Sequence, residues 1–239
     1  MKKFRNLIAN FSLIILGLLI TAPAQAEGIR GNGNVISQDR EVAEFDNIKV
    51  NGAFTIYLSQ NDDYSLRVVT DENLHPVIRS NVKGETLYIT TEKSIYKSKE
   101  LKLYIGFKHL RSIKANGAIS LKSDQNLRFD ELNIEINGAS SASLALQAHC
   151  LSIDNSGAST IKLKGVTDEL SIDISGAGSV NALDLKAQRA TVDISGVGSG
   201  KVNVEEDLKV RISGIGSVKY KGSPRITSDI SFLGTLKKY

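Results

Sequence analysis

Residues 171–180 read SIDISGAGSV, and residues 191–200, twenty positions later, read TVDISGVGSG. A glycine-rich phosphate loop would explain one such stretch, whereas a structural repeat would explain several. Aligning the chain on a glycine that follows Asn or Ser distinguishes these two explanations. The series comprises Gly52, Gly117, Gly138, Gly157, Gly176, Gly196 and Gly214, with a degenerate last copy at Gly234.

The residues before each glycine repeat as well. Ile, Val or Leu recur two, four and six positions ahead of it, and the residues between them are polar, which indicates a strand with one buried face. From Gly117 onward the glycines are 18 to 21 residues apart, a spacing too short for the usual helical crossover between parallel strands. The sequence therefore predicts an all-β chain that forms a parallel β-solenoid with roughly 20-residue turns. An antiparallel sandwich is the alternative, but it predicts no position-by-position repetition.

The glycines are expected to form the bends, because glycine accepts positive φ and tolerates close approach of neighbouring backbones. A phosphate loop would need a helix after the glycine turn, and here another strand follows. The sequence contains no G-x-S-x-G motif of a serine hydrolase, so no catalytic residues are predicted. We expect a hydroxyl ladder from the stacked serines Ser156, Ser175, Ser195 and Ser213.

Residues 1–26 have the pattern of a secretory signal peptide. Basic residues open the segment, an apolar run follows at 11–20, and Ala24-Gln25-Ala26 supplies a cleavage pattern. The apolar run is too short to span a bilayer, and no comparable stretch follows it. We therefore expect an exported chain without a transmembrane helix, located in the periplasm, at the outer surface or outside the cell.

The mature chain divides by composition into an N-terminal extension (27–43), a solenoid domain (44–236) and a short C-terminal tail (237–239). Within the domain, the regular repeats occupy residues 111–236, whereas residues 44–110 form a less regular, aromatic-rich β layer. We expect this layer to begin or cap the coil, because an open solenoid end is an unpaired edge. Its expected elements are strands at 54–58, 64–70, 86–91 and 101–107 and a hairpin turn at 82–85.

Charge and cysteine content exclude several classes of protein. Of 30 Lys and Arg, three belong to the signal peptide, which leaves 27 against 26 Asp and Glu. With no basic cluster among aromatic residues, we expect no nucleic-acid partner. Cys150 is the single cysteine, so it forms no internal disulfide and is expected to be a small buried apolar residue. Neither it nor the three histidines has the spacing of a zinc site, and no cofactor is expected.

Four carboxylates recur three positions before the glycines, between Lys114 and Arg211. Stacking would place them about 4.8 Å apart on one outer face. A solvated face, a site for Ca²⁺ or a basic partner, and catalysis by paired carboxylates all remain possible functions. Catalysis is the weakest of these, because a flat ladder does not give an acid and a base distinct environments. The ladder consists of Glu135, Asp154, Asp173 and Asp193.

Tyrosines gather in the aromatic-rich half, where packing is the simpler explanation and sugar stacking the functional one. Tyr96, within the polar segment KSIYKSKE, is the candidate for an exposed stacking ring.

The succession of motifs resembles the putative autotransporter-adhesin head-GIN-domain family of exported bacterial proteins. The relevant segments are EFDNI (44–48), VNG (50–52), GETLYI (84–89), the serial S-G-x-G-S units and YKGSP (220–224). This resemblance covers residues 44–236 and implies a right-handed β-helical fold and a surface or adhesion role. It provides no catalytic or binding residues to transfer. Asn155, in an otherwise apolar column, departs from the pattern.

We therefore expect an exported, non-enzymatic binding module of the cell envelope or surface, with an envelope glycan or a host-surface protein as its partner. A glycan-acting β-helix enzyme and a structural spacer without a ligand are the alternatives. A deep cleft with converging carboxylates and arginines would favour the enzyme, whereas a smooth polar face would favour binding or spacing.

Overall fold

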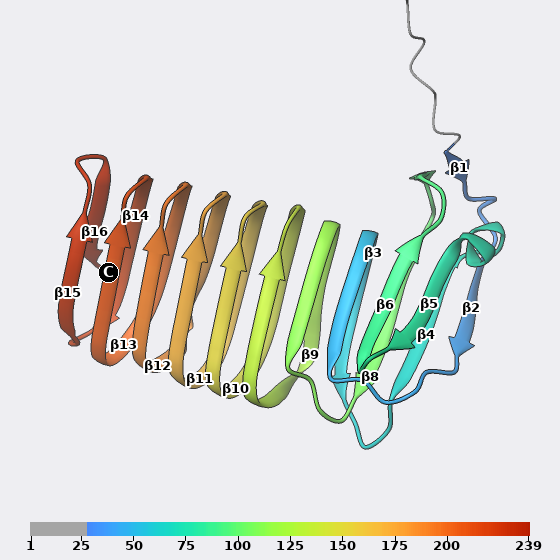
Figure 1. The fold of residues 1–239 in the computed structure, drawn as a ribbon, viewed down its shortest axis with the longest axis horizontal. Coiled ribbons are helices and arrows are strands. Elements are labelled where there is room, and N and C mark those ends of the chain that lie inside the picture. The colour runs from blue at the N-terminus through green and yellow to red at the C-terminus, as the bar shows by residue number, and fades with distance from the viewer. Residues whose placement is uncertain (1–27) are drawn as a thin grey trace, which may run out of the picture.

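The computed structural model describes residues 28–239, so the signal peptide expected at residues 1–26 lies outside the described part. As predicted, the chain forms a parallel β-solenoid, in which long strands lie side by side (Figure 1). Within residues 28–239, no helix is long and apolar enough to cross a bilayer. The regular strands are β9 (Ser112–Ile136), β10 (Ala139–Asn155), β11 (Ala158–Ile174), β12 (Ala177–Ile194), β13 (Val197–Ile212) and β14 (Ile215–Gly222), followed by β15 (Arg225–Ile230) and β16 (Gly234–Lys238).

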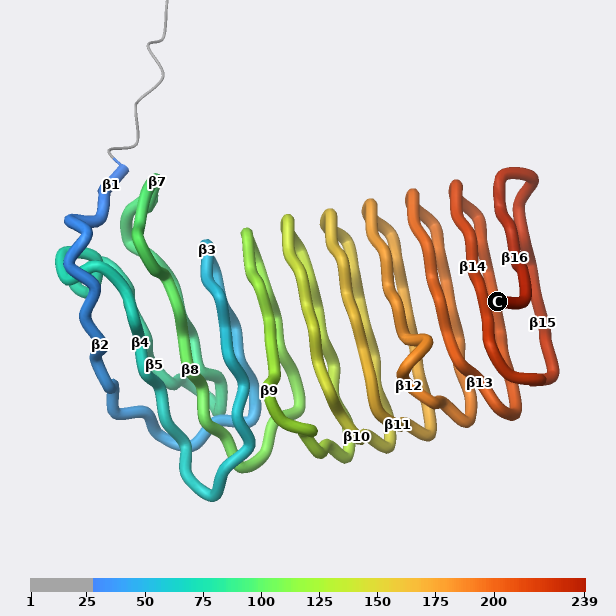
Figure 2. The backbone as a smooth tube through the Cα atoms, turned by 180° about the vertical axis from the view of Figure 1, so that it is seen from behind, coloured from blue at the N-terminus to red at the C-terminus, as the bar shows by residue number. Residues whose placement is uncertain are grey.

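Each turn of the coil is one continuous strand that bends near its middle, rather than the two shorter strands that the repeat pattern suggested. The chain therefore has a wide corner within each strand and a tight turn at the repeated glycine. We call the outer surface of the segments that lead into the tight turns the front face, and the outer surface of the segments that leave them the back face. Figures 1 and 2 view the coil from these two opposite sides.

The pairing register confirms the predicted columns. Ile134, Ile153, Ile172, Val192 and Val210 are direct partners on successive strands. All five are buried and belong to one continuous hydrophobic core that extends along the coil. The interior is therefore built from columns of equivalent residues, each supplied once per turn.

Most of the tight-turn glycines are required by backbone proximity and not by an unusual φ. Only Gly52 and Gly117 have positive φ, at 138° and 122°. At the later turns, an added Cβ would overlap the carbonyl oxygen of the glycine in the preceding turn. A Cβ on Gly196, for example, would overlap the carbonyl oxygen of Gly176. The same approach applies to Gly138, Gly157 and Gly214.

The last copy of the repeat differs from the sequence alignment. Gly234 pairs with Gly216, the second glycine of its S-G-x-G-S unit, and not with the turn glycine Gly214. Phe232 takes the turn position instead and is 100% exposed. The expected degenerate turn glycine at Gly234 is therefore wrong by two positions.

Inward-facing side chains on the two sides of each tight turn have complementary sizes. In β3 (Asn47–Gln60), Val50 precedes the turn and the large Phe54 follows it. In later turns isoleucine precedes and glycine follows, and a Cβ added to Gly198 would lie 2.9 Å from Cγ2 of Ile174. The second glycine of S-G-x-G-S therefore provides space for an isoleucine of the preceding turn.

Asn155 interrupts this arrangement in the middle of the coil. It is 1% exposed and pairs with Ile136 and Ile174 in the core column. Among the described residues, neither its Nδ2 nor its Oδ1 has a hydrogen-bond partner, and Ser159 Oγ nearby in sequence is also unpartnered. The turn thus buries polar atoms where its neighbours bury isoleucine.

The N-terminal layer continues both faces in a less regular way. The predicted hairpin is confirmed, with Gly84 and Glu85 at φ 54° and 58° in the turn. The expected N-terminal extension (27–43) contributes two strands, and the expected C-terminal tail (237–239) continues β16 as far as Lys238. The elements of the layer are β1 (Ile29–Arg30), β2 (Val35–Arg40), β3, β4 (Ser65–Asp71), η1 (Glu72–Val77), β5 (Ile78–Lys83), β6 (Thr86–Thr91), β7 (Ile95–Lys97) and β8 (Leu101–Phe107).

A buried carboxylate joins the parts of this layer. Asp71 is 1% exposed and accepts hydrogen bonds from the backbone N–H groups of Gly33 (2.5 Å) and Lys99 (2.8 Å). Burial alone raises the pKa of Asp71, but the backbone donors together outweigh it and hold that pKa below its usual value. Asp71 therefore fixes the segment around Gly33 and the segment before β8 against β4.

Candidate functional site

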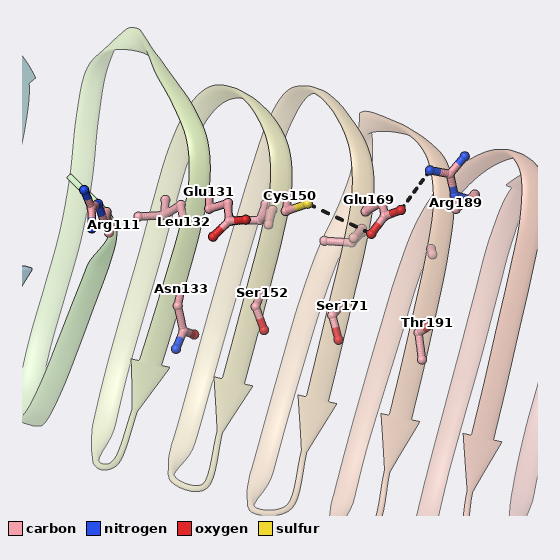
Figure 3. Close-up of a pocket in the computed structure, with 13 residues that line it drawn as sticks. Arg111, Glu131, Leu132, Asn133, Cys150, Ser152, Glu169, Ser171, Arg189 and Thr191 are labelled. Atoms are coloured by element: carbon pink, nitrogen blue, oxygen red, sulfur yellow. Dashed lines mark hydrogen bonds and ion pairs between the residues drawn. The ribbon is translucent and has the colours of Figure 1, made fainter. Parts of the chain in front are cut away.

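A groove of about 520 Å³ crosses several turns of the front face, beside the wide corner (Figure 3). One column of its lining consists of Glu131, Cys150, Glu169 and Arg189, which are direct partners on successive strands. Arg111 lies at the N-terminal end of this column in the figure. The groove therefore follows the long axis of the coil and is open along its length.

A second column, two residues further along each strand, is neutral. Asn133, Ser152, Ser171 and Thr191 are paired in register and line the groove with amide and hydroxyl groups. Strand alternation explains both columns, because residues two apart point to the same side. The buried Leu132, Leu151, Leu170 and Ala190 between the columns face the core.

The carboxylate ladder borders this neutral column on its other side. The register places Glu135, Asp154, Asp173 and Asp193 in one column, as the sequence predicted. Both predicted flanking cations form ion pairs with its ends. The polar stripe of the groove therefore lies between two columns of charged side chains.

Charge in the ladder is concentrated at its centre. Lys114 Nζ lies 2.5 Å from Glu135 Oε1, and Arg211 pairs with Asp193 at 3.6 Å. Hydrogen bonds from Asn137 and Lys114 lower the pKa of Glu135. Burial raises the pKa of Asp154, and the neighbouring carboxylates raise it further. Asp154 therefore has the most unfavourable environment for a charge in the ladder.

The ladder does not converge on a point. Within residues 28–239, no group of three or more His, Cys, Asp or Glu side chains is placed to hold a metal ion. Stacked carboxylates project in parallel from successive strands, whereas Ca²⁺ takes six to eight oxygen ligands around one centre. A cation at the ladder would need water or ligand oxygens for most of its coordination.

The groove column contains a thiol between two carboxylates. Burial raises the pKa of Cys150, and Glu169 and Glu131 raise it further. Arg189 pairs with Glu169 at 2.8 Å and lowers the pKa of that carboxyl. Cys150 is half-buried and faces outward, so the predicted buried apolar role is wrong. Its position seven residues before Gly157, in the outward-facing register, was the available signal.

An ion pair that sequence reasoning missed lies next to the groove at the wide corner. His149 Nδ1 lies 2.6 Å from Asp168 Oδ2, and this hydrogen bond raises the pKa of His149. Both side chains are more than half exposed. His149 and Asp168 each lie eight residues before a turn glycine, so the alignment contained their proximity.

The aromatic candidates are separated in the structure. Tyr96 is 67% exposed on β7, as expected, and its ring lies against Gly28. Tyr57 and Tyr104 stack on each other at 4.9 Å and 11°, and Lys122 Nζ lies 5.6 Å from the Tyr57 ring centroid. Because Tyr57 and Tyr104 each use one ring face to stack on the other, Tyr96 remains the candidate for sugar stacking.

The predicted serine ladder is wrong, because Ser156 bonds to an asparagine and not to another serine of the column. Ser156 donates to Asn137 Oδ1 at 2.5 Å, and Asn137 donates to Asn116, which donates to Asn51. Among the described residues, no side-chain hydrogen bond links the later serines of that column. Hydroxyl pairs form three residues after the turn glycine instead, as in Ser199 with Ser179 at 3.1 Å.

Comparisons with known proteins agree with this architecture. Among solved structures, the chain is similar to a putative adhesin from Bacteroides fragilis, with 28% identity and a TM-score of 0.83 over 89% of this chain and 100% of that chain. A putative adhesin and a putative lipid binding protein, both from Parabacteroides distasonis, share 23% and 24% identity, with TM-scores of 0.67 and 0.68. Each covers 89% of this chain and 100% of its own, and at this identity they support the fold alone.

No curated protein matches the sequence. A family model described as "Putative auto-transporter adhesin, head GIN domain" matches residues 44–224. That range is most of the chain, and it begins at the EFDNI segment and ends at YKGSP. The chain therefore belongs to the head GIN domain family of putative auto-transporter adhesins.

Proposed function

We propose that the protein is an exported, non-enzymatic binding module of the cell envelope or surface, and that its front-face groove binds an elongated glycan. The observation that carries this proposal is the neutral column formed by Asn133, Ser152, Ser171 and Thr191. It repeats an amide or hydroxyl group about every 4.8 Å along the coil. Such a repeat suits a polymer with its own regular hydroxyl groups better than a single small molecule.

The charged columns add selectivity to this polar stripe. Glu131 in the groove and Asp173 in the bordering carboxylate ladder are hydrogen-bond acceptors, and Arg111 and Arg189 are donors at the two ends of the groove. A glycan that carries amino groups besides hydroxyls satisfies both kinds of partner. The family description and the similarity to a B. fragilis protein called an adhesin support a surface binding role.

A glycan-acting enzyme is the second candidate, and one observation favours it. The pKa of Asp154 is raised by burial, whereas the pKa of Glu169 is lowered by Arg189. Such a divergence is typical of acid and base pairs. However, both carboxylates project from the same face, whereas glycosidases place theirs on either side of the scissile bond. This geometry supports binding over hydrolysis.

A glycan array and a panel of host-matrix proteins, probed with the mature chain, test the proposal. We expect retention of glycans, and at least a tenfold loss of affinity in Ser171→Arg, which fills the groove. Ser223→Arg is the matched control, because Ser223 is exposed between β14 and β15, away from the groove. Release of new reducing ends from a bound glycan would support the enzyme instead, and an array without signal would leave a structural spacer.

A further inference from the structure

A row of lysines runs along the back face of the coil. Lys122, Lys162, Lys201, Lys219 and Lys237 occupy one register position on β9, β11, β13, β14 and β16. Ser143 and Asn181 occupy the same position on the two intervening strands, β10 and β12. We call these five residues the lysine row. Its members are 18 to 40 residues apart in the sequence, so no local basic cluster reveals them.

The lysine row has no anionic partner among the described residues. The lysines that form ion pairs within residues 28–239 are Lys102, Lys114 and Lys186, none of which belongs to the row. Four members of the row are exposed and Lys201 is partly exposed. Lys201, Lys219 and Lys237 follow on successive strands, where like charges directly opposite one another repel. The fold therefore maintains an uncompensated positive stripe.

A parallel row of hydroxyl groups accompanies the lysines. Two residues earlier on each strand stands Ser or Thr, as in Thr160, Ser199 and Ser217. Alternation points these hydroxyls to the same side as the lysines. Neither row contains a carboxylate. The back face thus offers ammonium and hydroxyl donors together, whereas the front face carries the carboxylate ladder.

The axial spacing of the row constrains the ligand. Lys122, Lys162 and Lys201 occur on every second strand, which corresponds to about 9.6 Å. This length is close to one disaccharide of an extended glycan. A linear polymer presents its charges along a line, as the row does, whereas a membrane presents them over a plane.

We infer that the back face binds a linear anionic polysaccharide with regularly spaced sulfate or carboxylate groups, aligned with the coil axis. The lysine row provides the charge contacts, and the adjacent hydroxyls donate to the sugar and its anionic groups. This site lies on the opposite face from the groove and from the carboxylate ladder. It goes beyond the proposed function and does not depend on it.

Binding of the mature chain to heparin and to polygalacturonate, with neutral dextran as a control polymer, tests the inference. We expect one or both anionic polymers to bind, and the affinity to fall linearly with salt on logarithmic axes, as counterion release requires. Comparison of the two polymers distinguishes sulfate from carboxylate recognition. The triple variant K162Q/K201Q/K219Q should lose at least tenfold in affinity and show a shallower salt dependence.

The matched control is K83Q/K93Q/K108Q, which removes the same charge at exposed lysines outside the row. We expect its affinity to remain within twofold of the parent chain. Equal losses in both triple variants, no binding of either anionic polymer, or tighter binding of duplex DNA or phosphatidylglycerol vesicles would overturn the inference. The single variant K201Q, with a smaller loss than the triple, and unchanged thermal unfolding exclude misfolding as the cause.

The groove variant Ser171→Arg separates this site from the proposed function. It should retain binding of the anionic polymer, because Ser171 lies on the front face. Conversely, the triple variant K162Q/K201Q/K219Q should still bind any glycan that the groove binds. Failure of one site is therefore distinguishable from failure of the other.

Discussion

The repeats (111–236) and the N-terminal layer (28–110) achieve their stability in different ways. In the repeats, a residue is determined by its position within the turn, since each strand contacts copies of itself. In the N-terminal layer, individual side chains such as Asp71 join segments that have no repeat relationship. The comparison indicates that the close approach of neighbouring backbones restricts which residues the repeats accept. In the layer, the restriction comes from the need to give buried polar groups hydrogen-bond partners.

The largest effect is expected from alanine at a tight-turn glycine. In Gly196→Ala the new Cβ overlaps the carbonyl oxygen of Gly176, and only a backbone shift relieves the overlap. We expect a loss of about 3 kcal/mol in the free energy of unfolding, measured with urea. In Gly84→Ala, in the N-terminal hairpin, the new Cβ has open space around it. Only the backbone φ of 54° is then unfavourable for alanine, and we expect a loss of about 1 kcal/mol in the free energy of unfolding. Equal losses would contradict the difference between the two regions.

Removal of the buried carboxylate tests the N-terminal layer in the same way. Asp71→Ala leaves the N–H groups of Gly33 and Lys99 without their acceptor, and we expect a loss of about 2–3 kcal/mol. Asp62→Ala, at an exposed position in the β3–β4 loop, is the control and should be neutral.

The pH dependence of Asp71 has a defined sign. Because the pKa of Asp71 is lowered in the folded chain, its stabilisation is complete above the unfolded value of about 3.9 and is lost as pH falls through the folded pKa. Urea titrations from neutral to acidic pH should show the parent chain losing more stability than Asp71→Ala. Parallel curves would show that the carboxylate contributes nothing.

The unpartnered amide in the repeats predicts a gain. Asn155→Ile restores the core column and removes two unsatisfied polar atoms, so we expect a gain of about 1–2 kcal/mol. The reverse change in the next turn, Ile174→Asn, should cost about 3 kcal/mol for the same reason. Calorimetric melting of both variants measures the difference. Destabilisation by Asn155→Ile would show that the amide has a structural partner in solution.

The smallest effect concerns the ladder. The raised pKa of Asp154 means that the folded chain binds its proton more tightly, so stability rises as pH falls through that pKa. Asp154→Asn should therefore gain about 0.5 kcal/mol near neutral pH, with the gain vanishing in acid. Asp193→Asn, which removes the partner of Arg211, should change stability in the opposite direction. Melting temperatures of both variants at two pH values measure these changes. A shift in the same direction for Asp154→Asn and Asp193→Asn would contradict the prediction.

The alignment on glycine predicted most of the coil, because equal positions in a solenoid become direct neighbours. The ladder from Glu135 to Asp193 was found in this way, and four of the five lysines of the row lie five positions after a turn glycine, so the alignment contained them as well. The groove was not predictable, because the wide corner has no marker residue. The role of Asp71 required knowledge of two segments that only the folded layer brings together.

Equal register from turn to turn makes the coil adjustable in length. Duplication or loss of one complete unit, such as residues 158–176, would leave each interior column and both outer faces continuous, since a turn contacts only its neighbours. Each event would lengthen or shorten the lysine row and the groove by about 4.8 Å. Whole-unit recombination would therefore change the length of the polymer segment that the two proposed sites cover.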